Sequence, residues 1–102
     1  MLSLSSHPNI AMASAVARAY NDWTLDRWVR PHPQFKGSII VNPQDPEFSV
    51  EEIERLGDDP GMVQVMVFSG SNNPYGQPRF FKIWEAAAHY DLPVAMHTGG
   101  ET

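Results

Sequence analysis

Residues 62–68 read Met-Val-Gln-Val-Met-Val-Phe, and this stretch decides how the rest of the sequence is interpreted. Every residue except Gln64 is apolar. Such a run is typical of a β-strand covered on both faces, as strands of parallel sheets are. Because parallel strands are joined by long crossover connections, we expect helices on either side of it.

The sequence around this strand alternates between helix and strand patterns. Two further strands are predicted at residues 38–41 (SIIV) and 92–97 (LPVAMH), and residues 69–77 (SGSNNPYGQ) have the composition of a loop. Helices are predicted over residues 9–28, from Asp45 to Gly57, and over residues 79–90.

The helix ends carry recognisable signals. Asn9 is the predicted N-cap of the first helix. Asp45, with proline at the first helical position, is the predicted N-cap of the second, and Gly57 is its predicted end. Ser49 with Glu52 offers an alternative start, as a capping box.

The helical period predicts which sides are buried. In the first helix the expected apolar face consists of Ile10, Ala13, Val16, Ala17, Tyr20 and Trp23, with Arg18, Asn21 and Asp22 on the polar remainder. In the second helix we expect water to face Glu51, Glu52, Glu54 and Arg55.

The alternation predicts an α/β fold with right-handed crossovers and a parallel sheet. Three strands alone leave two open edges, and a complete (β/α)8 barrel needs about 250 residues. We therefore predict a partial (β/α)8 TIM-barrel, with residues 1–102 as a single incomplete barrel segment. The alternative is a small three-layer fold that closes its edges by self-association.

Composition excludes several classes of protein. Seven Lys and Arg against twelve Asp and Glu give a net charge of −5, which argues against a nucleic-acid partner. No apolar run approaches the roughly 18 residues of a membrane span, and residues 1–6 do not resemble a signal peptide. The absence of cysteine excludes disulfides, thiolate metal sites and a cysteine nucleophile. We expect a cytoplasmic protein without a membrane partner.

His97 is the main candidate for chemistry. It ends a predicted parallel strand, and ligands bind at that end of strands in barrels and open α/β sheets. Ala95 shares its face, and Gly99 and Gly100 would let the backbone approach a ligand closely. His97 is thus either a metal ligand or general acid/base, or a buried histidine bonded to a backbone carbonyl.

The loop of residues 69–77 lies at the same end of the predicted sheet. Asn73 and Tyr75 could bind a polar substrate there, although the same composition also suits a turn without any ligand. Ser69-Gly70-Ser71 could hold a phosphate, but the lysine of a P-loop is missing. His7 and His32 precede prolines in predicted loops and are expected at the surface, and His89 lies in the last turn of a predicted helix, where a cation suits the helix dipole.

Six segments in order resemble the amidohydrolase-related family, also called amidohydrolase 2, which includes the resorcylate-type decarboxylases. They are residues 19–23 (AYNDW), 42–46 (NPQDP), 52–55 (EIER), 74–78 (PYGQP), 83–87 (IWEAA) and 92–100 (LPVAMHTGG). The resemblance implies a (β/α)8 barrel that binds a divalent metal, with zinc as the expected ion and His97 as a ligand. The family's H-x-H pair, its later histidine and its last-strand aspartate have no counterpart in this sequence.

We therefore expect an interior segment of a metal-dependent hydrolase or non-oxidative decarboxylase that acts on a small carboxylated or cyclic substrate. The segment alone is expected to be inactive, and no catalytic residue beyond the metal ligand is assigned. A homo-oligomer is compatible with the open edges. The alternative is a non-catalytic α/β module that self-associates through its sheet edges.

Overall fold

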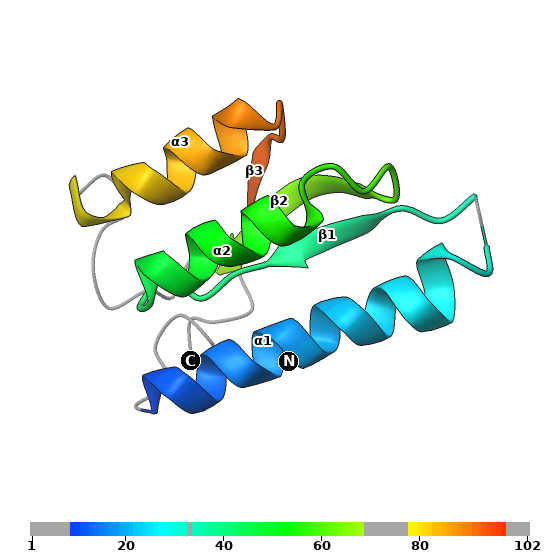
Figure 1. Cartoon of the computed structure of the whole chain (residues 1–102), viewed down its shortest axis with the longest axis horizontal. Helices are drawn as coiled ribbons and strands as arrows, with labels where there is room; N and C mark the ends of the chain where they lie inside the picture. Colours follow the sequence, from blue (N-terminus) through cyan, green and yellow to red (C-terminus); the bar gives the residue numbers. More distant parts are fainter. Residues whose placement is uncertain (1–8, 33, 69–77, 98–102) are drawn as a thin grey trace.

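The computed structural model describes residues 9–32, 34–68 and 78–97. It confirms the predicted alternation of helices and strands (Figure 1). The elements in chain order are α1 (Ile10–Thr24), a π-helical turn η2 (Leu25–Val29), β1 (Gly37–Ile40), α2 (Pro46–Leu56), β2 (Met62–Phe68), a 3-10 turn η3 (Pro78–Phe80), α3 (Phe81–His89) and β3 (Val94–His97).

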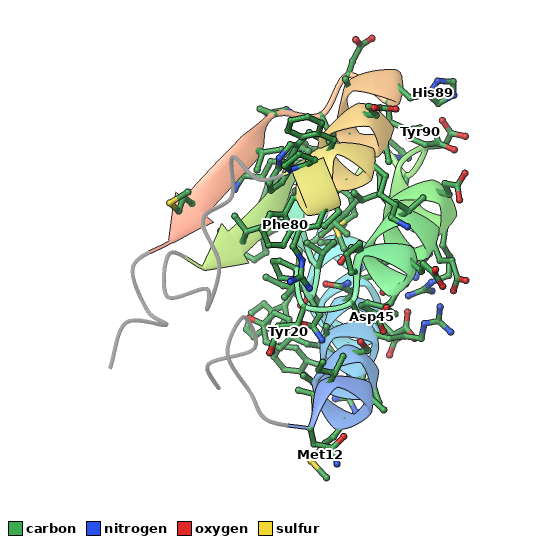
Figure 2. The ribbon with its side chains drawn as sticks, turned by 90° about the vertical axis from the view of Figure 1, so that its left-hand side faces the viewer. Met12, Tyr20, Asp45, Phe80, His89 and Tyr90 are labelled. Carbon is green, nitrogen blue, oxygen red and sulfur yellow. The ribbon has the colours of Figure 1, made fainter. Side chains whose placement is uncertain are left out.

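The three strands form one parallel sheet in the order β1-β2-β3. Ile39, Val65 and Val94 stand side by side across it. The helices α2 and α3 pack on the same side of the sheet (Figure 2), whereas α1 lies along β1 and packs against Ile40, whose side chain is on the other face. Strands added in chain order, with both crossover helices on one face, are wound in a single direction. This is the winding of a (β/α)8 barrel, whereas a doubly wound sheet reverses its strand order.

The main core lies between the sheet and its helices. Ile39, Val65 and Val67 point from the strands toward Ile53 of α2 and Ile83 of α3, and all five are buried. Burying each aliphatic side chain of this size contributes about 1.5–3 kcal/mol to folding. The sheet therefore holds its helices through an apolar layer, as the strand compositions predicted.

The opposite face of the sheet carries Ser38 and Ile40 of β1 with Gln64 and Met66 of β2, and among the described helices α1 contacts it at the carboxyl end of β1. Ser38 of β1 and Gln64 of β2 are half-buried there, and Gln64 Nε2 donates a hydrogen bond of 2.7 Å to Ser38 Oγ. The small and polar side chains at this end of the face suit the interior of a barrel, where little room is left between the strands. At the carboxyl end, Ile40 and Met66 make the same face apolar.

The predicted caps of the first two helices are confirmed. The Asn9 side chain accepts a hydrogen bond from the Met12 N–H, and that of Asp45 accepts one from the Phe48 N–H. The alternative capping box is wrong, because the Ser49 hydroxyl instead donates to the Asn42 carbonyl at 2.7 Å. Glycine is required at position 57, since a Cβ there would collide with the Tyr90 ring.

The predicted apolar face of α1 is partly wrong. Tyr20 and Trp23 are 40% and 48% exposed, whereas Asn21 is fully buried. The small side chains of Ala13 and Ala17 allow α1 to lie close to β1, and this approach brings Asn21 against the strand. The bulky rings of Tyr20 and Trp23 do not fit into so narrow a space. They lie beside it, with their ring centroids 6.0 Å apart.

The chain continues from α1 into the π-helical turn η2. Here the Arg30 N–H donates to the Leu25 carbonyl five residues earlier. Leu25 and Val29 enter the main core from this turn. No helix in the described part of the chain is long and apolar enough to cross a membrane.

The outer strand β3 is only partly covered. Val94 and Met96 are 41% and 60% exposed, although their register partners Val65 and Val67 are buried. The apolar rows of the sheet therefore continue beyond the region that α2 and α3 protect.

We predict that the isolated chain unfolds over a broad temperature range, because its outer strand lacks the packing that makes unfolding cooperative. Circular dichroism as a function of temperature, on a sample shown to be monomeric, tests this. A sharp two-state transition of the monomer would contradict the prediction.

Candidate functional site

The carboxyl ends of the three strands lie at one edge of the sheet. His97 is the last residue of β3 and is paired with Phe68, the last residue of β2. Its backbone therefore stands where a barrel binds its ligands, as predicted. The side chains of both residues lie outside what the structure describes, so the role of His97 as a metal ligand stays a prediction.

The other predicted site residues fall in segments that are not described. Asn73 and Tyr75, together with Ser69-Gly70-Ser71, belong to residues 69–77, which lie outside the described residues. Substrate binding by Asn73 and Tyr75 therefore also remains a prediction.

Asn42 stands at the same edge, two residues after the end of β1. It is fully buried, and its Nδ2 atom donates to the Ile10 carbonyl at 3.3 Å and to Ser14 Oγ at 3.2 Å. Ser14 Oγ in turn donates to the second oxygen of Asp45, the cap of α2. These contacts tie the beginnings of α1 and α2 to the end of β1. Asn42 and Asp45 therefore fix the edge at the carboxyl ends of the strands, here called the rim, and are not free to act as catalysts.

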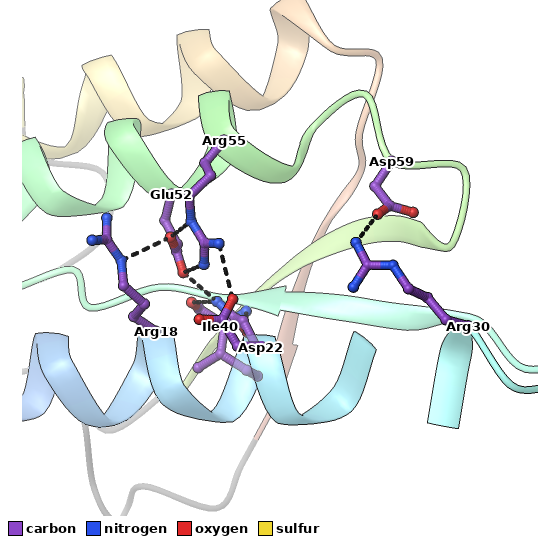
Figure 3. A network of polar contacts seen from close by, with 8 residues as sticks. Arg18, Asp22, Arg30, Ile40, Glu52, Arg55 and Asp59 are labelled. Carbon is purple, nitrogen blue, oxygen red and sulfur yellow. Dashed lines mark hydrogen bonds and ion pairs between the residues drawn. The ribbon is translucent and has the colours of Figure 1, made fainter. Parts of the chain in front are cut away.

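A second polar network is buried farther along α1 and α2 (Figure 3). Glu52 of α2 is 0% exposed, and its Oε2 atom accepts a hydrogen bond of 2.9 Å from Asn21 Nδ2. Arg55 Nε donates to Glu52 Oε1 at 2.7 Å, and Arg18 Nε lies 3.5 Å from the same oxygen. The expectation that Glu52 faces water is therefore wrong, because it forms the buried contact between the two helices.

The partners of Glu52 determine its charge. Burial by itself raises the pKa of Glu52, but hydrogen bonds from Arg55 and Asn21, with the charges of Arg55 and Arg18, more than offset this effect. The pKa of Glu52 is therefore lowered below its ordinary value of 4.5. The hydrogen bonds to Glu52 and to Asp22 also raise the pKa of Arg55. Glu52 is thus a buried carboxylate at neutral pH.

The spacing of residues in α1 indicates the burial of Asn21, which the predicted apolar face did not include. Ala13, Ala17 and Asn21 follow one another at intervals of four, so Asn21 lies on the stripe of small residues that faces β1. In α2, Glu52 is adjacent to the buried Ile53 and lies three residues after the buried Ser49. A polar residue in line with small or buried neighbours indicates a buried hydrogen bond.

Among the described residues, no three histidine, aspartate or glutamate side chains gather in a way that could hold a metal ion. His32 is half-buried between the rings of Trp28 and Phe35, and His89 is exposed in the last turn of α3. Of the histidines in the described segments, only His97 stands at the carboxyl ends of the strands. An imidazole suits a divalent transition metal, but it is one ligand of the several that such a site needs.

We predict that Glu52→Gln destabilises the chain at neutral pH by roughly 1–3 kcal/mol, because the amide cannot satisfy the donors of Arg55 and Asn21 together. A group whose pKa is lowered on folding stabilises the protein above its unfolded pKa, and this contribution is lost as the pH falls through its folded pKa. The difference between wild type and variant should therefore be constant above about pH 5 and shrink below 4.5.

The midpoint of urea unfolding, followed by circular dichroism from neutral to acidic pH, measures this difference. Glu54→Gln, an exposed change on the same helix, is the matched control and should have little effect. An equal loss in both variants, or a loss independent of pH, would remove the buried charge as the cause.

Comparison with known proteins agrees with this architecture. The chain is similar to two solved structures of 5-carboxyvanillate decarboxylase from Novosphingobium aromaticivorans, each at 27% identity with a TM-score of 0.85. Both contain manganese and a hydroxy-methoxy-nitrobenzoic acid. The alignments cover 93% of this chain but only 28% and 27% of the decarboxylase chains, so the chain spans little more than a quarter of their length.

No curated protein matches the chain. The predicted α/β fold is confirmed, since the structural relatives are TIM-barrel amidohydrolases and the parallel strands with their helices form part of that architecture. The resemblance seen in the sequence is confirmed as well, because residues 6–102 match the model of the amidohydrolase family. The chain therefore belongs to the amidohydrolase family.

Proposed function

We propose that this chain forms part of a metal-dependent enzyme that removes a carboxyl group from a small aromatic acid without oxidation. The observation that carries the proposal is the position of His97. It ends the outer strand of a singly wound parallel sheet, and this sheet superimposes on a decarboxylase that contains manganese and a substituted benzoic acid. In barrels of this kind the reactive groups lie at the carboxyl ends of the strands.

The metal would be held by His97 together with ligands from outside this chain. Neutral imidazole suits zinc, whereas manganese prefers oxygen ligands, so a manganese site would need carboxylates beside His97. Zinc is the ion that the family resemblance implied, and manganese is the ion in the solved relatives. When bound, a divalent ion supplies a Lewis acid that binds and polarises oxygen atoms of the substrate. Metal analysis of the purified protein distinguishes the two ions.

Two residues that follow β2 in the sequence would bind the substrate in this proposal. Asn73 and Tyr75 would contact the polar groups on its aromatic ring. In the reaction, the bond between the ring carbon and the carboxylate breaks, carbon dioxide leaves, and a proton takes its place on the carbon. The residue that delivers the proton would lie outside this chain, which is why the isolated chain is expected to be inactive.

Hydrolysis is the second candidate, because the matching family is described as amidohydrolase. The two reactions are distinguished by their products, because only decarboxylation releases carbon dioxide. The protein from the full coding region is incubated with manganese or zinc and with 5-carboxyvanillate, and carbon dioxide release is measured. Release of carbon dioxide supports decarboxylation, whereas bound metal without turnover of any aromatic acid would reject it.

If the chain is instead a non-catalytic module, the purified protein should contain no bound metal. A module that only self-associates would form a stable, metal-free oligomer, which size-exclusion chromatography with metal analysis would show. A cytoplasmic location and a homo-oligomeric enzyme remain predictions, which cell fractionation and the measured mass of the protein test.

We predict that His97→Ala, in the protein from the full coding region, removes most of the bound metal and lowers activity by at least about a hundredfold, because a ligand of the ion is lost. Metal content is measured by mass spectrometry alongside activity. His89→Ala is the matched control, since His89 is an exposed histidine in the last turn of α3, before the amino end of β3 and not at its carboxyl end. Unchanged metal content in the first variant would remove His97 from the site.

A further inference from the structure

The two outer edges of the sheet differ in whether a side chain bonds to their outward backbone groups. An outer strand presents unpaired N–H and C=O groups, and these can bind any other strand that approaches, including one from a second copy. In β1, the backbone groups of Ile40 bond to a side chain of α1 and not to β2, so alternation turns those of Ser38 toward the outer edge as well. In β3, Pro93 accepts from Val65 of β2, so the groups of Val94 and Met96 face outward.

At the β1 edge, one side chain takes the place of a neighbouring strand. The Ile40 N–H donates to Asn21 Oδ1 at 2.9 Å, and Asn21 Nδ2 donates to the Ile40 carbonyl at 2.9 Å. A primary amide presents its acceptor and its donor side by side, so it can satisfy both outward groups of one residue. Asn21 is fully buried, and its second amide hydrogen is held by Glu52. The amide is therefore fixed in place.

No comparable contact covers the β3 edge. Among the described residues, no side chain bonds to the backbone of Val94 or Met96, and the two side chains are exposed and uncharged. They lie on the face that α2 and α3 cover farther along the sheet. A further parallel strand would continue the winding here, and a right-handed crossover would place its helix over Val94 and Met96.

We propose that Asn21 closes the β1 edge to strand pairing at Ile40, so that the sheet is extended at β3 by a parallel strand with a covering helix. In a closed barrel, the strand next to β1 would then bond to β1 only below this point, at Ser38. The proposal concerns the edges of the sheet and does not depend on the metal or on the reaction.

Hydrogen exchange of single backbone amides, measured by NMR on the chain as it stands, tests the proposal without any substitution. The Ile40 amide should exchange as slowly as that of Ile39, which is paired with β2, whereas the Met96 amide should exchange fast. If Ile40 exchanges as fast as Met96, the proposal is wrong, whatever the variants show.

Asn21→Ala then tests the consequence of opening the edge. The variant loses both hydrogen bonds to Ile40 and the one to Glu52, and the loss of the acceptor for the Ile40 N–H should speed exchange there by roughly tenfold or more. The variant should also self-associate at lower protein concentration than wild type, as measured by light scattering. Unchanged exchange at Ile40, or unchanged association, would overturn the proposal.

Ser49→Ala is the matched control for a general loss of stability. It removes hydrogen bonds to the carbonyls of Asn42 and Asp45 but leaves the β1 edge closed. Self-association of this control equal to that of Asn21→Ala would assign the effect to instability and contradict the proposal. Met96→Lys, which places a charge on β3, should leave the association gained by Asn21→Ala in place; if it abolishes that association, the β1 edge is not its route.

Discussion

The amide of Asn21 holds together the part of the structure on which the rest depends. It binds both backbone groups of Ile40 at the end of β1 and donates to the buried carboxylate of Glu52 in α2. A buried carboxylate is strongly unfavourable unless its oxygens are paired. Arg55 and Arg18 supply that pairing from the surface. One strand and two helices are therefore fixed relative to each other by contacts that tolerate little displacement.

This constraint has a consequence for the carboxyl ends of the strands. The chain leaves β1 through Asn42, whose side chain holds the beginning of α1, and reaches Asp45, which caps α2. The two networks lie along the same pair of helices, one at Ile40 and the other directly beyond it. The rim on this side is thus a rigid polar framework, and groups that act on a substrate can be placed precisely beside it.

The winding of the sheet separates packing from chemistry. The helices α2 and α3 bury Ile39, Val65 and Val67 on one face, and the other face carries Ser38 and Gln64 toward the amino ends of the strands. In a barrel the second face becomes the interior and the strand ends become the site. The family membership of this chain fits that division, because the similar decarboxylase structures hold their metal and aromatic acid in such an architecture.

Local patterns in the sequence determined the strand of residues 62–68, the caps at Asn9 and Asp45, the parallel alternation and the family. These features depend on neighbouring residues and on short spacings. Only the tertiary structure decided that Asn21 and Glu52 are buried while Tyr20 and Trp23 are exposed. A polar side chain is buried without a large free-energy cost only where it finds hydrogen-bond partners. The partners of Asn21, Ile40 and Glu52, come from distant parts of the chain, so local sequence patterns do not reveal them.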